Sequence, residues 1–183
     1  MKTLFIDSGI SGIAGDMALA AFTEIGADLA EISDKLQTVI NEDFSLSIKN
    51  VVKKGLSSSH LIINTEEEKH SHRHYTNIKK AIEDSELDDA EKLTSLSMFE
   101  VIAKAEAKIH NSTLEKVHFH EVGGVDSMID IIGTAIAFHQ LEIDRVISSP
   151  VAAGNGYKHN RTNNSVHDCK FYCSTTISLK MAL

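Results

Sequence analysis

The chain has 183 residues, of which 42% are hydrophobic and 24% charged, a composition typical of one folded domain or of one domain and part of a second. Its formal net charge of −8 argues against nucleic acid and against an anionic membrane surface as partners. No apolar run is long enough for a membrane span or a signal peptide. The two cysteines, Cys169 and Cys173, make no disulfide framework, so we expect a cytoplasmic protein.

The N-terminal segment has the pattern of a strand, a glycine-rich loop and a helix. Residues 2–7 predict the strand and residues 16–26 the helix, with Asp16 as its N-cap. Gly12 and Gly15 in the loop allow backbone N–H groups to face an anion. The loop lacks the Lys-Ser/Thr of a phosphate-binding loop and the spacing of a dinucleotide-binding loop, so its glycines could equally serve a tight turn alone.

The middle of the chain predicts a second helix over 27–40 and then a β-hairpin. Apolar and polar residues alternate over 44–52 and again near 61–63, and Lys54-Gly55 is a turn signal between the two strands. The next stretch, 66–74, has no apolar residue and predicts a loop. In an extended loop His70, His72 and His74 share one side and could collect a metal loosely; the alternative is a solvated charged loop.

The remaining periodic segments predict helices over 77–83, 88–110 and 125–141 and a strand over 142–149. The expected fold class is α+β (mixed α/β), with a small sheet that includes the hairpin and with helices packed mainly on one face. Residues 158–183 lose this periodicity. We therefore expect one domain over 1–157 and an atypical, disordered tail over 158–183.

The segment 117–130 concentrates the groups that bind divalent transition metals. The predicted metal ligands in it are His118, His120, Glu121, Asp126 and Asp130. If 118–120 is extended, both imidazoles lie on one face and Phe119 on the other; if the helix starts at 125, the two aspartates share a face. The alternative is a solvated His-x-His strand with a first-turn acid that favours the helix dipole.

These features together resemble the nickel-insertion cyclometallases, which mature the nickel-pincer cofactor of lactate racemase. The resemblance covers about residues 1–157. The motifs that carry it are Ser11-Gly12, Gly15-Asp16-Met17, His70–His74, 103–110, the HFHEVGGVDS run at 118–127 with Asp130, Ser149-Pro150-Val151 and Gly154-Asn155-Gly156. The glycine loop is about one residue longer than the family's usual form.

The resemblance implies nickel insertion into pyridinium-3,5-bisthiocarboxylic acid mononucleotide, at the expense of CTP with Mg²⁺ or Mn²⁺, by an enzyme classed as a lyase. It implies that nickel is held by the ligands of 117–130, with the histidine-rich loop gathering the metal. The substrate would lie at Ser11, Gly12, Gly15 and Asp16. The family chain continues into a CTP-binding part, so we expect this chain to be the N-terminal half and to be inactive without the C-terminal half.

The residues themselves are compatible with two other functions. One is a nickel store or metallochaperone without catalysis of its own, which the histidine tract favours. The other is a metal-dependent phosphoester hydrolase that uses Asp7 and Asp16. The pattern assigns no catalytic base, and it leaves homo-oligomerisation undecided.

Overall fold

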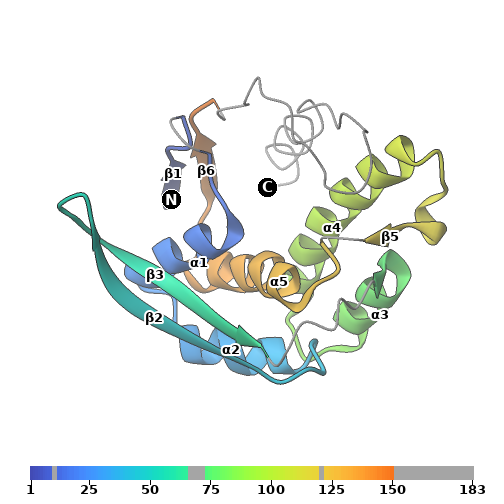
Figure 1. The fold of residues 1–183 in the computed structure, drawn as a ribbon, viewed down its shortest axis with the longest axis horizontal. Helices are drawn as coiled ribbons and strands as arrows, with labels where there is room; N and C mark the ends of the chain where they lie inside the picture. The colour runs from blue at the N-terminus through green and yellow to red at the C-terminus, as the bar shows by residue number, and fades with distance from the viewer. Residues whose placement is uncertain (10–11, 66–72, 120–121, 151–183) are drawn as a thin grey trace.

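A computed structural model gives the fold and describes residues 1–9, 12–65, 73–119 and 122–150 (Figure 1). The helices are α1 (Gly15–Glu24), α2 (Leu29–Gln37), α3 (Tyr75–Asp84), α4 (Asp89–Ile109) and α5 (Val125–Gln140), with a short 3-10 helix, η1 (Leu114–Lys116). The strands are β1 (Thr3–Ile6), β2 (Phe44–Lys53), β3 (Leu56–Thr65), β4 (Arg73–His74), β5 (His118–Phe119) and β6 (Arg145–Ser148). The fold is mixed α+β, which confirms the predicted class.

The described strands form three separate pairs, whereas the sequence predicted one small sheet. β1 pairs with β6 in parallel, β2 with β3 antiparallel, and β4 with β5 antiparallel. The tail predicted over 158–183 lies outside the described residues, so that expectation is untested. No helix in the described ranges has the length and apolar character needed to cross a bilayer.

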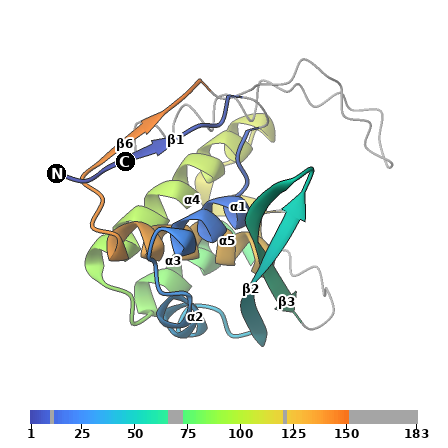
Figure 2. The same ribbon diagram turned by 90° about the vertical axis from the view of Figure 1, so that its left-hand side faces the viewer.

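Helix α5 occupies the centre of the molecule, with α1, α2 and α4 packed around it (Figures 1 and 2). Its sequence is apolar on nearly all sides, as expected of a helix surrounded by other elements. The fully buried side chains at its contacts are Ile129, Ile132 and Ile136 of α5, Leu19 of α1, Ile32 and Leu36 of α2, and Phe99 of α4. This packing fixes the position of the N-terminus of α5, where the candidate site lies.

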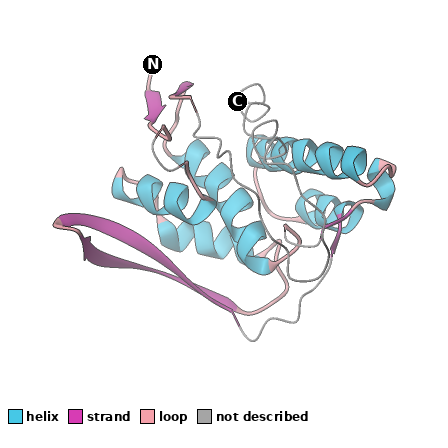
Figure 3. Cartoon of the chain, turned by 45° about the horizontal axis from the view of Figure 1, so that its top comes forward, coloured by secondary structure: helices cyan, strands magenta, loops and turns pink. Residues whose placement is uncertain are grey.

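The hairpin β2–β3 runs along one side of the helices (Figure 3). Its register pairs Lys53 with Leu56, so Lys54 and Gly55 form the turn, and both have positive φ. A two-residue turn of this kind matches the right-handed twist of the strands and favours glycine. Leu61 is buried against the helices, which confirms the predicted half-buried hairpin.

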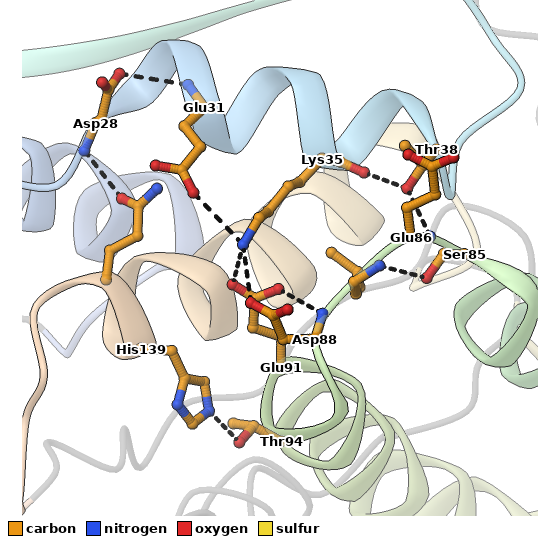
Figure 4. Close-up of polar contacts among 12 residues, drawn as sticks. Asp28, Glu31, Lys35, Thr38, Ser85, Glu86, Asp88, Glu91, Thr94 and His139 are labelled. Atoms are coloured by element: carbon orange, nitrogen blue, oxygen red, sulfur yellow. Dashed lines mark hydrogen bonds and ion pairs between the residues drawn. The ribbon is translucent and has the colours of Figure 1, made fainter.

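A buried ion pair joins α2 to α4 (Figure 4). Lys35 Nζ lies 2.7 Å from Glu91 Oε1, and Glu91 is only 2% exposed. Burial acts to lower the pKa of Lys35, but hydrogen bonds and charge from Glu91 and then Asp88 outweigh it and raise that pKa. Glu91 also accepts from the Asp88 backbone N–H as part of a capping box at the start of α4.

Replacing Lys35 with methionine should destabilise the protein by roughly 3 kcal/mol, because it leaves the Glu91 carboxylate buried without a cation. Chemical denaturation would measure the loss. The exposed pair Lys104–Glu100 is the matched control, and Lys104→Met should change stability by less than about 0.5 kcal/mol. Equal effects of the two variants would contradict the prediction.

Candidate metal centre

The glycine-rich loop delivers the first turn of α1 directly onto α5. Gly12 has φ +75° and donates its N–H to the Ser8 carbonyl at 3.1 Å, which closes a turn after β1. A Cβ placed on Gly15 would lie 2.7 Å from Asp130 Cγ and still closer to its Cβ. Glycine is therefore required at position 15 for the backbone of α1 to approach α5.

Asp16 is not the N-cap of α1 that the sequence predicted. The N-cap is Ala14, which makes no side-chain capping bond, and Asp16 lies within the first turn. Its Oδ1 accepts from the Met17 N–H at 2.8 Å. The helix begins earlier than predicted because Gly15 can adopt helical geometry against Asp130, and Asp16 is thereby carried to the junction of α1 and α5.

At this junction Asp16 and Asp126 lie close enough to Asp130 for their charges to act on its carboxyl group. The pKa of Asp130 is raised to about 6, chiefly by burial, then by the negative charges of Asp16 and Asp126, while a hydrogen bond from the Asp16 N–H opposes the shift. In the described structure Asp130 Oδ1 is buried and has no hydrogen-bond partner. Asp126 and Asp130 share one face of α5, as their spacing predicted. Uncompensated negative charge of this kind is relieved by a bound cation.

Two of the predicted imidazole ligands lie together on the strand pair β4–β5. His74 is directly opposite His118, and their ring centroids are 4.6 Å apart. Phe119 is 1% exposed and packs against Phe99 and Tyr75. Because side chains alternate along a strand, the burial of Phe119 directs His118 to the other face, which confirms that part of the prediction.

Arg73 holds the turn between β5 and α5 in place, a role that the sequence did not predict. Its guanidinium donates to the Gly123 carbonyl at 2.7 Å and forms an ion pair with Glu42. A Cβ on Gly123 would lie 3.0 Å from the Arg73 backbone N, so the chains approach closely here. The only available signal is a single arginine within the histidine-rich segment 66–74, which the sequence predicts to be either a metal-collecting loop or a solvated charged loop.

The structure thus regroups the residues that the sequence assigned to separate sites. His74, predicted to belong to the loose collecting loop, pairs with His118 of the main cluster. Asp16, predicted to bind substrate, lies beside the predicted metal ligand Asp130. The predicted site residues His70, His72, Ser11, His120 and Glu121 lie outside the described residues. Within the described ranges, no three or more His, Cys, Asp or Glu side chains are arranged to hold a metal ion. The described residues therefore provide a pair of imidazoles and, separately, the neighbouring carboxylates of Asp16, Asp126 and Asp130.

Asp130→Asn should stabilise the protein at pH 7 and have no effect below about pH 4. The folded state binds the Asp130 proton more tightly than an ordinary carboxyl does, so stability falls as pH rises from about 4 to about 6 and stays lower above that. After allowance for solvent screening, the gain at pH 7 should be about 1 kcal/mol. Thermal unfolding across this pH range measures it. Asp34→Asn, on the exposed side of α2, is the control, and a pH-independent effect of Asp130→Asn would be the contrary result.

Comparison with known proteins assigns the chain to a family. The sequence model of the family described as "Nickel insertion protein" matches residues 4–163. A relative from Staphylococcus epidermidis, named pyridinium-3,5-bisthiocarboxylic acid mononucleotide nickel insertion protein, is 43% identical over 158 residues, which are 86% of this chain and 40% of that protein. Proteins of the same name from Geobacillus kaustophilus and Akkermansia muciniphila are 41% and 40% identical, and each match covers 85% of this chain and 40% of the relative.

The chain therefore spans about two fifths of the length of these relatives. No solved structure is significantly similar to it. The family match includes the glycine-rich loop, the β4–β5 histidine pair and the carboxylates at the α1–α5 junction. With this match over most of its length, the chain belongs to the nickel insertion protein family.

Proposed function

We propose that this chain is the N-terminal part of an enzyme that inserts nickel into pyridinium-3,5-bisthiocarboxylic acid mononucleotide. The observation that carries the proposal is the contact of His74 with His118 in a chain of the nickel insertion family. The two residues come from segments far apart in the sequence. Imidazole nitrogen is a favourable donor to nickel, and a pair fixed on two strands loses little entropy on binding.

In this proposal His118 and His74 are nickel ligands, together with His120 and Glu121, which follow β5. His70 and His72 gather nickel from dilute solution and pass it to the pair. Only neutral imidazole binds a metal, so the affinity should fall below about pH 6 as the histidines protonate.

The α1–α5 junction is the proposed substrate-binding side of the site. Gly12, with its positive φ, and Gly15, packed against Asp130, lead into α1, and Ser11 is the further proposed substrate-binding residue of this segment. A bare phosphate would be repelled by Asp16 and Asp130, whereas a divalent cation bound to Asp126 and Asp130 could join a substrate phosphate to this end of α1. The mononucleotide would then present its thiocarboxylates to nickel.

The finer features of the proposed reaction belong to the whole enzyme. The chemistry forms nickel–sulfur and nickel–carbon bonds, consumes CTP with Mg²⁺ or Mn²⁺, and is that of a cytoplasmic lyase in the maturation of lactate racemase. CTP would be bound by the C-terminal part of the enzyme. The chain by itself is accordingly expected to bind nickel and to make no cofactor.

The test supplies purified mononucleotide, nickel, CTP and Mg²⁺ to the chain, with and without a polypeptide comprising the remainder of the Staphylococcus epidermidis relative. The absorbance of the nickel-pincer product should appear only in the complete mixture. Multiple turnovers by this chain alone would overturn the N-terminal-part proposal, and no product in any mixture would overturn nickel insertion.

A nickel store or metallochaperone without catalysis of its own is the second candidate, favoured by the histidine-rich segment and by the His74–His118 pair. It predicts nickel binding and transfer without product in the complete mixture. A phosphoester hydrolase that uses Asp7 with Asp16 is disfavoured. The described contact of Asp7 is with the Gly9 N–H, at 3.2 Å, whereas Asp16 interacts with Asp130.

A further inference from the structure

The parallel pair β1–β6 carries apolar side chains on its outward face. Phe5 of β1 lies opposite Ile147 of β6, and they are 63% and 39% exposed. Leu4, which points to the other face, packs against the core. The pair lies at the margin of the helices in two views (Figures 1 and 2). Among the described residues, this outward face is partly exposed, whereas the opposite face of the pair packs against the core.

A two-stranded parallel sheet with one face exposed is unusual in a folded protein. Parallel sheets generally have both faces covered, and a two-stranded sheet has little stability of its own. Over the ranges that the structure describes, no further strand pairs with the free edge of β1 or of β6. Within these ranges, both edges thus lack a neighbouring strand and could accept an added one.

The relatives indicate what covers this face. About three fifths of each relative lies outside the match with this chain. Just after β6, the Oγ of Ser149 accepts a hydrogen bond from the Ser8 N–H at 2.8 Å, beside the end of β1. If this chain is the N-terminal part, the portion that follows it in the longer proteins comes after residue 163, where the family match ends, and β6 is the last described element before that point. Covalent attachment would then give that portion a high effective concentration at the β1–β6 sheet.

We propose that the C-terminal portion of the family protein docks on the face formed by Phe5 and Ile147 and extends the β1–β6 sheet. This inference rests on the proposed function, in which this chain is the N-terminal part. Two apolar side chains are far less than the ~800 Å² per partner of a stable interface, so the backbone hydrogen bonds of an added strand must supply part of the contact.

The test measures binding of the intact chain to the polypeptide comprising the remainder of the Staphylococcus epidermidis relative, by calorimetry. Phe5→Asp and Ile147→Asp should each weaken binding at least tenfold. Val52→Asp is the matched control, because Val52 is 73% exposed on the hairpin, away from the β1–β6 pair, and should leave binding unchanged. Circular dichroism and thermal unfolding check that each variant is folded. Hydrogen exchange of the β1 amides should slow in the complex.

Unchanged binding of both aspartate variants, or no binding by the parent chain, would overturn the docking proposal. Self-association of the parent that the aspartate variants abolish would assign the face to a second copy and also overturn it. Nickel insertion by the mixture is scored separately. A complex that depends on Phe5 but makes no cofactor contradicts the proposed function and leaves the docking surface standing. Full insertion with Phe5→Asp contradicts the docking surface only.

Discussion

Replacing either His74 or His118 with alanine should weaken nickel binding by the chain roughly 100-fold, at the upper end of the effects seen for groups around a metal. The two rings are in contact, so each variant removes half of one donor pair rather than a ligand from an independent site. Nickel titration of the purified chain measures the affinity. In the mixture with the C-terminal portion, both variants should fail to make cofactor at any nickel concentration.

The informative comparison is between His74 and the rest of its histidine-rich segment. The double variant His70→Ala, His72→Ala should remove only weak binding and retain activity at high nickel. His60→Ala is a matched control, since His60 is an exposed histidine of β3. If His74→Ala behaves like the double variant and not like His118→Ala, the imidazole pair is structural and the collecting loop extends to His74.

Gly15→Ala should destabilise the fold by about 2–3 kcal/mol, as overpacking of a tight contact does. The added Cβ would overlap the Cβ of Asp130 and approach its Cγ to 2.7 Å. The Cβ of Asp130 is attached directly to the backbone of α5 and has no rotamer that avoids the overlap, so α1 and α5 must separate. Thermal unfolding should show a midpoint lower by roughly 5–10 °C for a chain of this size.

Two further variants separate backbone crowding from loss of the carboxylate group. Gly133→Ala also adds a Cβ on α5, but its nearest neighbour, at 3.0 Å, is the methyl end of Leu19, which can shift, so little stability should be lost. Asp130→Ala keeps the Cβ and removes the charge, so the penalty of Gly15→Ala should persist in that background. Disappearance of the penalty there would show that the carboxylate, and not the approach of the helices, makes Gly15 necessary.

The local pattern of the sequence was sufficient for most of the elements. Alternation over 44–52 with the Lys54-Gly55 turn predicted the hairpin, and the apolar run after Gly124 predicted α5 to within one residue of its end. The alternation of His118 with Phe119 predicted that their side chains lie on opposite faces, and the structure buries Phe119. These features follow from the periods of strands and helices, which neighbouring residues fix without reference to the rest of the chain.

Only the tertiary structure decided which of these elements meet. The pairing of His74 with His118 depends on strands of two residues each, too short for any periodicity to predict. The raised pKa of Asp130 requires burial and the approach of Asp16 from another helix, and both come from the packing of α1 on α5. The sequence predicted one small sheet because it marks strands but not their partners; the parallel pairing of β1 with β6 is set by the packing of the helices between them.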